Sequence, residues 1–215
     1  MPQETTNNKL NDPSLPAEST DELTVAIIML AAGSSKRFGT NDKLLADIDG
    51  KPVIFHTLEA VNSARTVTTL VVADTRNSEL LELLDPLPIT IARNKKACEG
   101  IGGSIAAGIT ALPEHVDGAL ILPADMPWMT AELLDHLIKV FKKEKGRKVI
   151  VPLAPTGEQR NPVIWPKRHF ADLAQLKGDA GAKRLIPTST ADKLEVLHNS
   201  AKPFRDIDTP ADLRT

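Results

Sequence analysis

The chain has 215 residues, enough for one domain with a sizeable core, and its 26 basic and 28 acidic side chains give a net charge of −2. This balance argues against a broadly basic surface for nucleic acid or an anionic membrane. Cys98 is the only cysteine, which excludes an intrachain disulfide and a multi-cysteine zinc site and fits a reducing cytoplasm. No apolar run approaches the length of a membrane span, and no signal-peptide pattern is present. We therefore expect a cytoplasmic protein with no nucleic-acid or membrane partner.

Residues 1–24 are rich in Asn, Pro, Ser, Thr and Glu and show no hydrophobic periodicity. Such a segment cannot bury enough apolar surface to offset the entropy that ordering would cost. No Pro- or Gly-rich linker and no internal repeat divides the remainder. We expect a flexible tail over residues 1–24 and one domain over residues 25–215.

Apolar runs typical of strands alternate with helix-like stretches along the domain. The run at residues 25–30 is continuous, as expected for a strand buried on both faces of a parallel sheet. Helices are predicted at residues 53–64, after Pro52, and at residues 131–143, where Thr130 can cap the first turn. The alternation predicts an α/β fold of βαβ units in which the later strands extend the same sheet. Those strands are expected at residues 69–73, 89–92, 119–122, 148–152 and 162–165.

The turn after the first strand has the composition of a phosphate-binding loop. Its small residues, AAGSS at positions 31–35, let backbone N–H groups approach an anion, and Lys36, Arg37 and Lys43 bring positive charge within reach. The segment matches neither the Walker pattern nor the dinucleotide fingerprint. From these residues alone, a nucleoside triphosphate site and a plain strand-to-helix connection are both open.

The sequence LAAGSSKRFGTNDKLL, at residues 30–45, resembles the signature of the nucleotidyltransferase superfamily that includes the molybdenum cofactor guanylyl- and cytidylyltransferases. Asp42 precedes Lys43, where sugar and isoprenoid nucleotidyltransferases usually have proline, so the resemblance is to the molybdopterin branch. It implies a single-domain, Rossmann-like α/β/α fold of three layers with a mostly parallel sheet, of the nucleotide-diphospho-sugar transferase type. The resemblance implies that Arg37 and Lys43 are catalytic residues.

The same loop also implies which nucleotide is bound. In this branch the guanylyl enzymes typically carry LAGG and the cytidylyl enzymes LAAG, and this chain has LAAG. The resemblance therefore implies CTP as substrate, held by Leu30, Ala31, Ala32 and Gly33. GTP remains the alternative within the branch.

A glycine-rich segment, GIGGSIAAGI at residues 100–109, leads into an Ala-rich helix. On its own it is equally a helix start with close backbone packing or a place where N-terminal amides hold a base or a ribose. The resemblance implies nucleotide contact, and it assigns Gly102 and Ser104 to the nucleotide site.

Acidic residues in two distant segments are candidates for a metal site. Asp125 ends the apolar run of ALILPADMPWM, and Asp206 and Asp208 belong to DIDTPADL, which resembles the C-terminal pattern of the family. Without the resemblance, Asp125 would be interpreted as stabilising a turn. The resemblance implies Mg²⁺, or Mn²⁺, held by Asp125 with Asp206 or Asp208, with Asp206 preferred. Asp212 is instead expected to close a capping box with Thr209.

Two later segments resemble loops that bind the second substrate: GEQRNPVIW at residues 157–165 and LKGDAGAKRL at residues 176–185. They imply substrate contacts from Arg160 and Asp179. The first departs from the RGHP often found in cytidylyl members, and in the second Lys183 replaces an arginine, whose anion geometry differs. The acceptor is therefore open, and a sugar or alditol phosphate is an alternative to molybdopterin.

The reaction implied by the resemblance is transfer of CMP from CTP to the terminal phosphate of molybdopterin, with release of pyrophosphate. Two unit charges about 4 Å apart repel by about 4 kcal/mol at an effective dielectric near 20, so this reaction needs cations. Arg37, Lys43 and Mg²⁺ would supply them, with Asp125 catalytic through the metal. A non-catalytic module that delivers the cofactor to a molybdoenzyme client is the alternative from another class.

Overall fold

The computed structural model describes residues 23–33, 38, 42–66, 68–95, 97, 100–179 and 181–214 of the chain. The predicted tail lies outside the described residues apart from Leu23 and Thr24. Arg37, which the resemblance makes catalytic, and Cys98 also lie outside them. Within the described part of the chain, no helix combines the length and the apolar character needed to cross a membrane.

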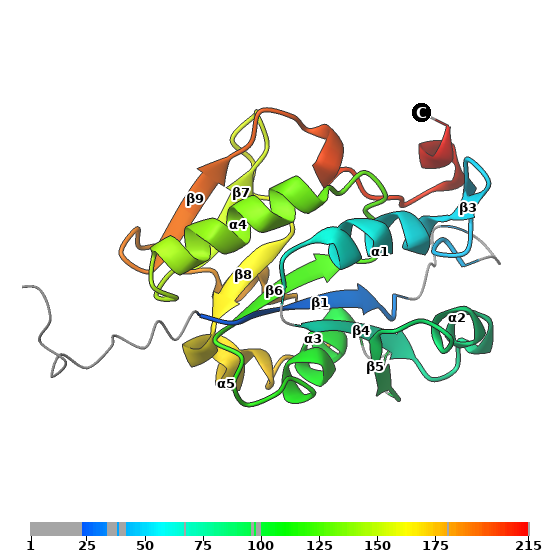
Figure 1. Ribbon diagram of the computed structural model, residues 1–215, viewed down its shortest axis with the longest axis horizontal. Coiled ribbons are helices and arrows are strands. Elements are labelled where there is room, and N and C mark those ends of the chain that lie inside the picture. Colours follow the sequence, from blue (N-terminus) through cyan, green and yellow to red (C-terminus); the bar gives the residue numbers. More distant parts are fainter. Residues whose placement is uncertain are drawn as a thin grey trace, which may run out of the picture.

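A seven-stranded sheet runs through the molecule (Figure 1). Its strands are β1 (Val25–Ala31), β4 (Thr68–Asp74), β5 (Thr90–Asn94), β6 (Gly118–Pro123), β7 (Val149–Leu153), β8 (Val163–Pro166) and β9 (Lys193–Leu197). They are ordered β5-β4-β1-β6-β8-β7-β9, and β8 is antiparallel to both of its neighbours while the other pairs are parallel. A separate hairpin consists of β2 (Asp47–Ile48) and β3 (Lys51–Pro52). The predicted mostly parallel sheet is confirmed.

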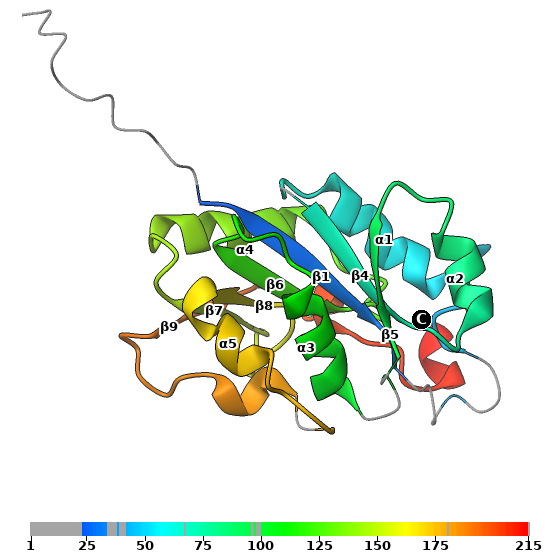
Figure 2. The ribbon, with the colours of Figure 1, turned by 90° about the horizontal axis from the view of Figure 1, so that it is seen from below.

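Helices cover both faces of this sheet and complete the three predicted layers. The helices are α1 (Val53–Ser63), α2 (Ser78–Leu84), α3 (Ile101–Thr110), α4 (Ala131–Lys143) and α5 (Phe170–Leu173). Short 3₁₀ helices span Lys167–His169, Ala182–Leu185, Lys202–Phe204 and Pro210–Leu213. α1 and α4 lie above the sheet in Figure 1, and α3 and α5 lie below it. Seen from below, α3 and α5 are in front of the strands (Figure 2).

Alternate residues of β1 enter two separate cores, one on each face of the sheet. Val25, Ile27 and Met29 pack with residues of α1, α2 and α4, whereas Ile28 packs with residues of α3 and α5. All four side chains are buried. A strand buried on both faces needs no polar side, and this is why its sequence is continuously apolar rather than alternating.

Capping residues and apolar patterns in the sequence predicted the bounds of α4 correctly, but they missed several shorter elements. The hydroxyl of Thr130 accepts a hydrogen bond from the amide of Leu133 at 3.3 Å, and the helix begins and ends where the pattern predicts. The prediction missed α2, β9 and the β2–β3 hairpin. The missed strand β9 lies at the edge of the sheet and is only partly buried, so it has no continuous apolar run.

The order of the strands changes direction at β1. β4 and β5 are added on one side of it, and the chain then passes through α3 to form β6 on its other side. In open α/β sheets, ligands bind in the crevice at the carboxyl ends of the strands at such a point. The fold therefore brings the carboxyl ends of β1 and β6 side by side.

Candidate active site

The loop after β6 is held in place by two hydrogen bonds to its first residue, Ala124. The amide of Ala124 donates to the carbonyl of Leu30, at the end of β1, at 3.0 Å. The hydroxyl of Thr57, which is fully buried on α1, donates to the carbonyl of Ala124 at 2.9 Å. Together these bonds fix the backbone from which the side chain of Asp125 extends.

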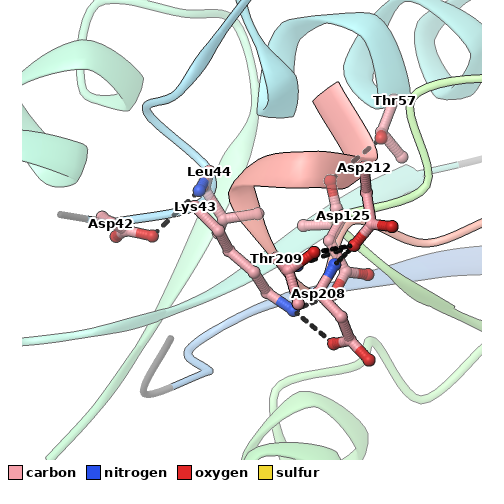
Figure 3. Close-up of polar contacts among 9 residues, drawn as sticks. Asp42, Lys43, Leu44, Thr57, Asp125, Asp208, Thr209 and Asp212 are labelled. Atoms are coloured by element: carbon pink, nitrogen blue, oxygen red, sulfur yellow. Dashed lines mark hydrogen bonds and ion pairs between the residues drawn. The ribbon is translucent and has the colours of Figure 1, made fainter. Parts of the chain in front are cut away.

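Lys43 reaches the carboxylate of Asp125 from the turn that begins at Asp42 (Figure 3). Asp42 shapes this turn, because its Oδ1 accepts a hydrogen bond from the amide of Leu44 at 2.9 Å. The Nζ of Lys43 donates a hydrogen bond to Oδ2 of Asp125 and lies 3.6 Å from Oδ1 of Asp208. One ammonium group thus joins carboxylates from two segments that are far apart in the sequence.

The carboxylate of Asp125 is mostly shielded from water. Its side chain is 14% exposed, and that of Lys43 is 16% exposed. Burial raises the pKa of Asp125 above its ordinary value, the ammonium of Lys43 opposes this rise, and the charge of Asp206 adds to it. Oδ1 of Asp125 is buried and has no hydrogen-bond partner among the described residues. Because an unpaired buried oxygen is costly, this atom is a candidate for a further ligand.

A C-terminal segment packed on the same loop carries Asp208. The amide of Ile207 donates to the carbonyl of Asp125 at 2.9 Å, and the Ile207 side chain is fully buried. Oδ2 of Asp212 accepts hydrogen bonds from the amides of Asp208 at 3.1 Å and Thr209 at 2.7 Å. The bond from the Thr209 amide contributes most to lowering the pKa of Asp212. The predicted capping box is confirmed, and the role of Asp212 is structural.

The aspartates suit a site for a hard divalent cation. Asp125 and Asp208 share Lys43, and Asp206 is close enough to Asp125 for its charge to raise the pKa of that residue. Across the described ranges, no cluster of three or more His, Cys, Asp or Glu side chains has the arrangement of a complete metal site. Two carboxylates, completed by water and substrate phosphates, form the donor set typical of Mg²⁺. The residues present therefore fit a metal ion that binds together with a phosphate substrate.

A cavity of about 260 Å³ opens beside these aspartates, and Asp206 is part of its lining. Most of its wall is apolar, with Trp165 and Phe204 as the aromatic members. Arg160 and Lys183 add positive charge to the lining. The two segments that resemble acceptor loops, which are separate in the sequence, thus contribute to one cavity.

The predicted nucleotide residues of the first loop lie where β1 ends. Leu30 lines the cavity, Ala31 and Ala32 are buried, and Gly33 is exposed. Because the alanine side chains are inside the protein, a ligand contact from Ala31 or Ala32 would use backbone groups.

The residues predicted from the glycine-rich segment have internal partners in this structure. The amide of Gly102 donates to the carbonyl of Gly178 at 2.9 Å. Ser104 is 3% exposed, and its hydroxyl accepts a hydrogen bond from the side chain of Asn94 at 3.2 Å. Asp179 is exposed on the loop that Gly102 contacts. These contacts support the packing interpretation, and the nucleotide role of Gly102 and Ser104 stays a prediction.

Replacing Gly102 by alanine is expected to destabilise the protein. The added Cβ would lie 2.9 Å from the backbone N and O of Lys177, and backbone atoms cannot give way as a flexible side chain can. Overpacking of this kind costs about 1–3 kcal/mol, so the Tm of Gly102→Ala should fall in thermal unfolding. Gly181→Ala, whose Cβ would meet Ile101 at 3.6 Å, is the matched control and should keep its Tm. An unchanged Tm in Gly102→Ala would contradict the packing role.

Thr57 is not among the predicted residues of the site, and Trp165 is included only as the last residue of the segment 157–165 that resembles an acceptor loop. Thr57 is a polar residue on the buried face of α1, and a polar residue at a core position is a signal that it bonds to something specific. Trp165 lies at the end of an apolar strand, where a large buried side chain is ordinary. Apart from the resemblance of its segment, nothing in the sequence distinguishes it from a core residue.

Residues 27–194 match the family model of the MobA-like NTP transferase domain. The chain belongs to this family. The matched region contains Lys43, Asp125 and most of the residues that line the cavity. The resemblance inferred from the loop after β1 is thereby confirmed at the level of the family, and the chain is a nucleotidyltransferase of this type.

The chain is also similar over most of its length to other proteins and to a solved structure. The molybdenum cofactor guanylyltransferase of Shewanella frigidimarina is 27% identical over 187 residues, which cover 85% of this chain and 90% of that protein. The purine catabolism protein PucB of Bacillus subtilis is 28% identical and covers 85% of this chain and 91% of its own length. The crystal structure of Rv0371c from Mycobacterium tuberculosis in complex with manganese has a TM-score of 0.69 at 20% identity and covers 89% of this chain and 96% of that one. At this identity the structural similarity supports the fold alone.

Proposed function

We propose that this MobA-like NTP transferase transfers a nucleoside monophosphate, CMP in the first instance, to the terminal phosphate of molybdopterin. An oxygen of the acceptor phosphate forms a bond to the α-phosphorus of the triphosphate. The bond from the α-phosphorus to the oxygen bridging to the β-phosphate breaks, and pyrophosphate leaves with the electron pair. The observation that carries the proposal is the contact of Lys43 with Asp125 and Asp208 at the carboxyl ends of β1 and β6, beside the cavity.

Charge neutralisation is the main task of the protein in this reaction. A triphosphate and a phosphate monoester repel each other, and phosphoryl-type transfer depends on positioning and electrostatic stabilisation rather than on a protein nucleophile. Lys43 provides a cation at the strand ends. Arg37 follows the same loop in the sequence, and we assign it to the departing pyrophosphate as its counter-ion.

Asp125, with Asp206 or Asp208, would hold Mg²⁺ or Mn²⁺. When bound, such a cation neutralises phosphate charge and orients the triphosphate. The buried, unpaired Oδ1 of Asp125 supports this assignment, since a cation would satisfy it. The manganese named with the Rv0371c structure supports a divalent cation in a protein of the same fold.

Lys43 changes its partner in the proposed reaction. In the free protein it is the counter-ion of Asp125, whose shielded carboxylate would be destabilised if it were left unpaired. A triphosphate carries more negative charge than a carboxylate, so its binding draws the ammonium away and releases Oδ2 of Asp125. Nucleotide and metal then each bind more tightly in the presence of the other.

The cavity supports an acceptor that has an apolar face and an anionic group. Its walls include Trp165 and Phe204, and Arg160 and Lys183 provide the positive charge. Molybdopterin combines a planar ring system with a phosphate, and the aromatic walls favour it. The lining also contains Gln159 and Asn161, which can hydrogen-bond the hydroxyls of a sugar or alditol phosphate, so such an acceptor is kept as the alternative that the assay tests.

GTP is a second candidate for the nucleotide. The LAAG sequence at residues 30–33 resembles the cytidylyl form and favours CTP. The Shewanella frigidimarina relative, in contrast, is named a guanylyltransferase, and this favours GTP. The reaction and the site are the same in both cases, and only the base differs.

Pyrophosphate release in the presence of molybdopterin, Mg²⁺ and one triphosphate at a time tests the proposal. With CTP we expect pyrophosphate and a cytosine dinucleotide of molybdopterin, identified by mass spectrometry. Activity with GTP alone would keep the mechanism and change the product, and activity only with sugar or alditol phosphates would overturn the acceptor. Absence of pyrophosphate with every triphosphate would contradict transfer and favour a module that delivers the cofactor to a molybdoenzyme client.

A further inference from the structure

Arg205 and Trp128 connect the two segments that carry the aspartates of the site. The guanidinium carbon of Arg205 lies 4.5 Å from the centroid of the Trp128 ring, which is a cation–π contact. Trp128 follows Asp125 in the loop after β6, and Arg205 directly precedes Asp206. The contact therefore joins the loop after β6, which carries Asp125, to the C-terminal segment, which carries Asp206 and Asp208.

The C-terminal segment is held against this loop at two alternate residues. Ile207 is fully buried, and its amide donates to a loop carbonyl at 2.9 Å. Arg205 has extended backbone torsions, with φ −77° and ψ 132°, and successive residues of an extended chain face opposite sides. Asp206 and Asp208 are thereby turned away from the side that Arg205 and Ile207 share. This agrees with the contact of Asp208 with Lys43 and with the place of Asp206 in the cavity lining.

We propose that Arg205 is a positioning residue for Asp206 and Asp208. The buried side chains of Phe204 and Ile207 hold the segment in the core on either side of Arg205 and Asp206. The stacking of Arg205 on Trp128 adds a direct side-chain link to the loop that carries Asp125, and this link sets the position of Asp206 and Asp208 relative to Asp125. This inference rests on the proposed function, because the positions of the two carboxylates matter through the metal they would hold.

A double-mutant cycle of Arg205→Ala and Trp128→Leu tests this role. Calorimetry measures the affinity for Mn²⁺ in the presence of α,β-methylene CTP. The same titration is repeated with α,β-methylene GTP. Each single variant is expected to weaken Mn²⁺ binding about fivefold, and the double variant to weaken it no further, since both changes remove one contact. Trp128→Phe keeps an aromatic face and should restore most of the affinity. Arg93→Ala, which removes an exposed arginine paired with Asp85, is the matched control.

The outcomes separate a positioning role from a structural one. A lower Tm with unchanged Mn²⁺ affinity in Arg205→Ala would mean that the contact only stabilises the fold, and it would overturn the proposal. Additive losses in the double variant would also overturn it, because independent residues add. If the wild-type protein bound no Mn²⁺ with either analogue, the metal site of the proposed function would itself be wrong. That result differs from a failure of the Arg205 proposal because the wild-type protein alone reveals it, whereas the proposal is tested only by the variants.

Discussion

Asp125→Asn is expected to lower the rate of pyrophosphate release at least about 100-fold at saturating triphosphate and Mg²⁺, the size of effect found when one preorganised electrostatic group is removed from a reaction centre. The substitution keeps the shape of the side chain and removes its charge. The buried Oδ1 then no longer attracts a cation, and Lys43 loses its ion pair with residue 125 while its more distant contact with Asp208, at 3.6 Å, remains. The measurement is steady-state pyrophosphate release under the conditions proposed for the wild-type protein.

Asp135→Asn is the matched control for this variant. Asp135 lies on α4 and accepts a hydrogen bond from the amide of Arg65 at 2.6 Å, on a surface that does not line the cavity. Its turnover should equal that of the wild type. Thermal unfolding of both variants separates loss of catalysis from loss of the fold. Wild-type turnover of a folded Asp125→Asn protein at saturating Mg²⁺ would show that the metal assignment is wrong.

Lys43→Met is expected to have opposite effects on turnover and on metal binding. Turnover should fall about 100-fold, because the triphosphate loses its cation at the strand ends. In the absence of nucleotide, however, Mn²⁺ should bind about tenfold more tightly than to the wild type, because Asp125 is left buried without its counter-ion and a divalent cation can take that place. Calorimetric titration with Mn²⁺ alone, at mildly alkaline pH where the carboxylates are ionised, measures the second effect.

Two further variants make this prediction specific. The double variant Lys43→Met/Asp125→Asn should lose the gained affinity, since the carboxylate that attracts the cation is gone. Lys51→Met removes a lysine that contacts Glu59 at 2.6 Å, outside the site, and should leave both turnover and Mn²⁺ affinity unchanged. If Lys43→Met bound free Mn²⁺ no more tightly than the wild type, the ammonium would not compete with the metal, and the exchange of partners would be refuted.

Several parts of this protein follow from its sequence because the interactions involved are local. The apolar run of β1 predicts a strand buried on both faces, and the two cores confirm it. Thr130 predicts the start of α4, and the pairing of Thr209 with Asp212 predicts the capping box. Each of these depends on hydrogen bonds or periodicity within a few residues, which the order of side chains determines directly. The resemblance then pointed to Lys43 in the first signature segment and to Asp125 in the segment ALILPADMPWM as residues of one reaction.

Which groups meet was decided by the tertiary structure alone. Lys43 and Asp125 are 82 residues apart, and the bond from Thr57 to the carbonyl of Ala124 spans 67 residues. Both contacts exist because β6 returns to lie beside β1 although β4 and β5 come between them in the chain. The packing of Gly102 on Gly178, which favours one of two equal sequence interpretations, depends on the same long-range arrangement. Local hydrophobic periods are compatible with many strand orders, and the entropy of closing a long loop changes only slowly with its length, so neither selects among them. Only the simultaneous packing of side chains on both faces of the sheet selects one strand order.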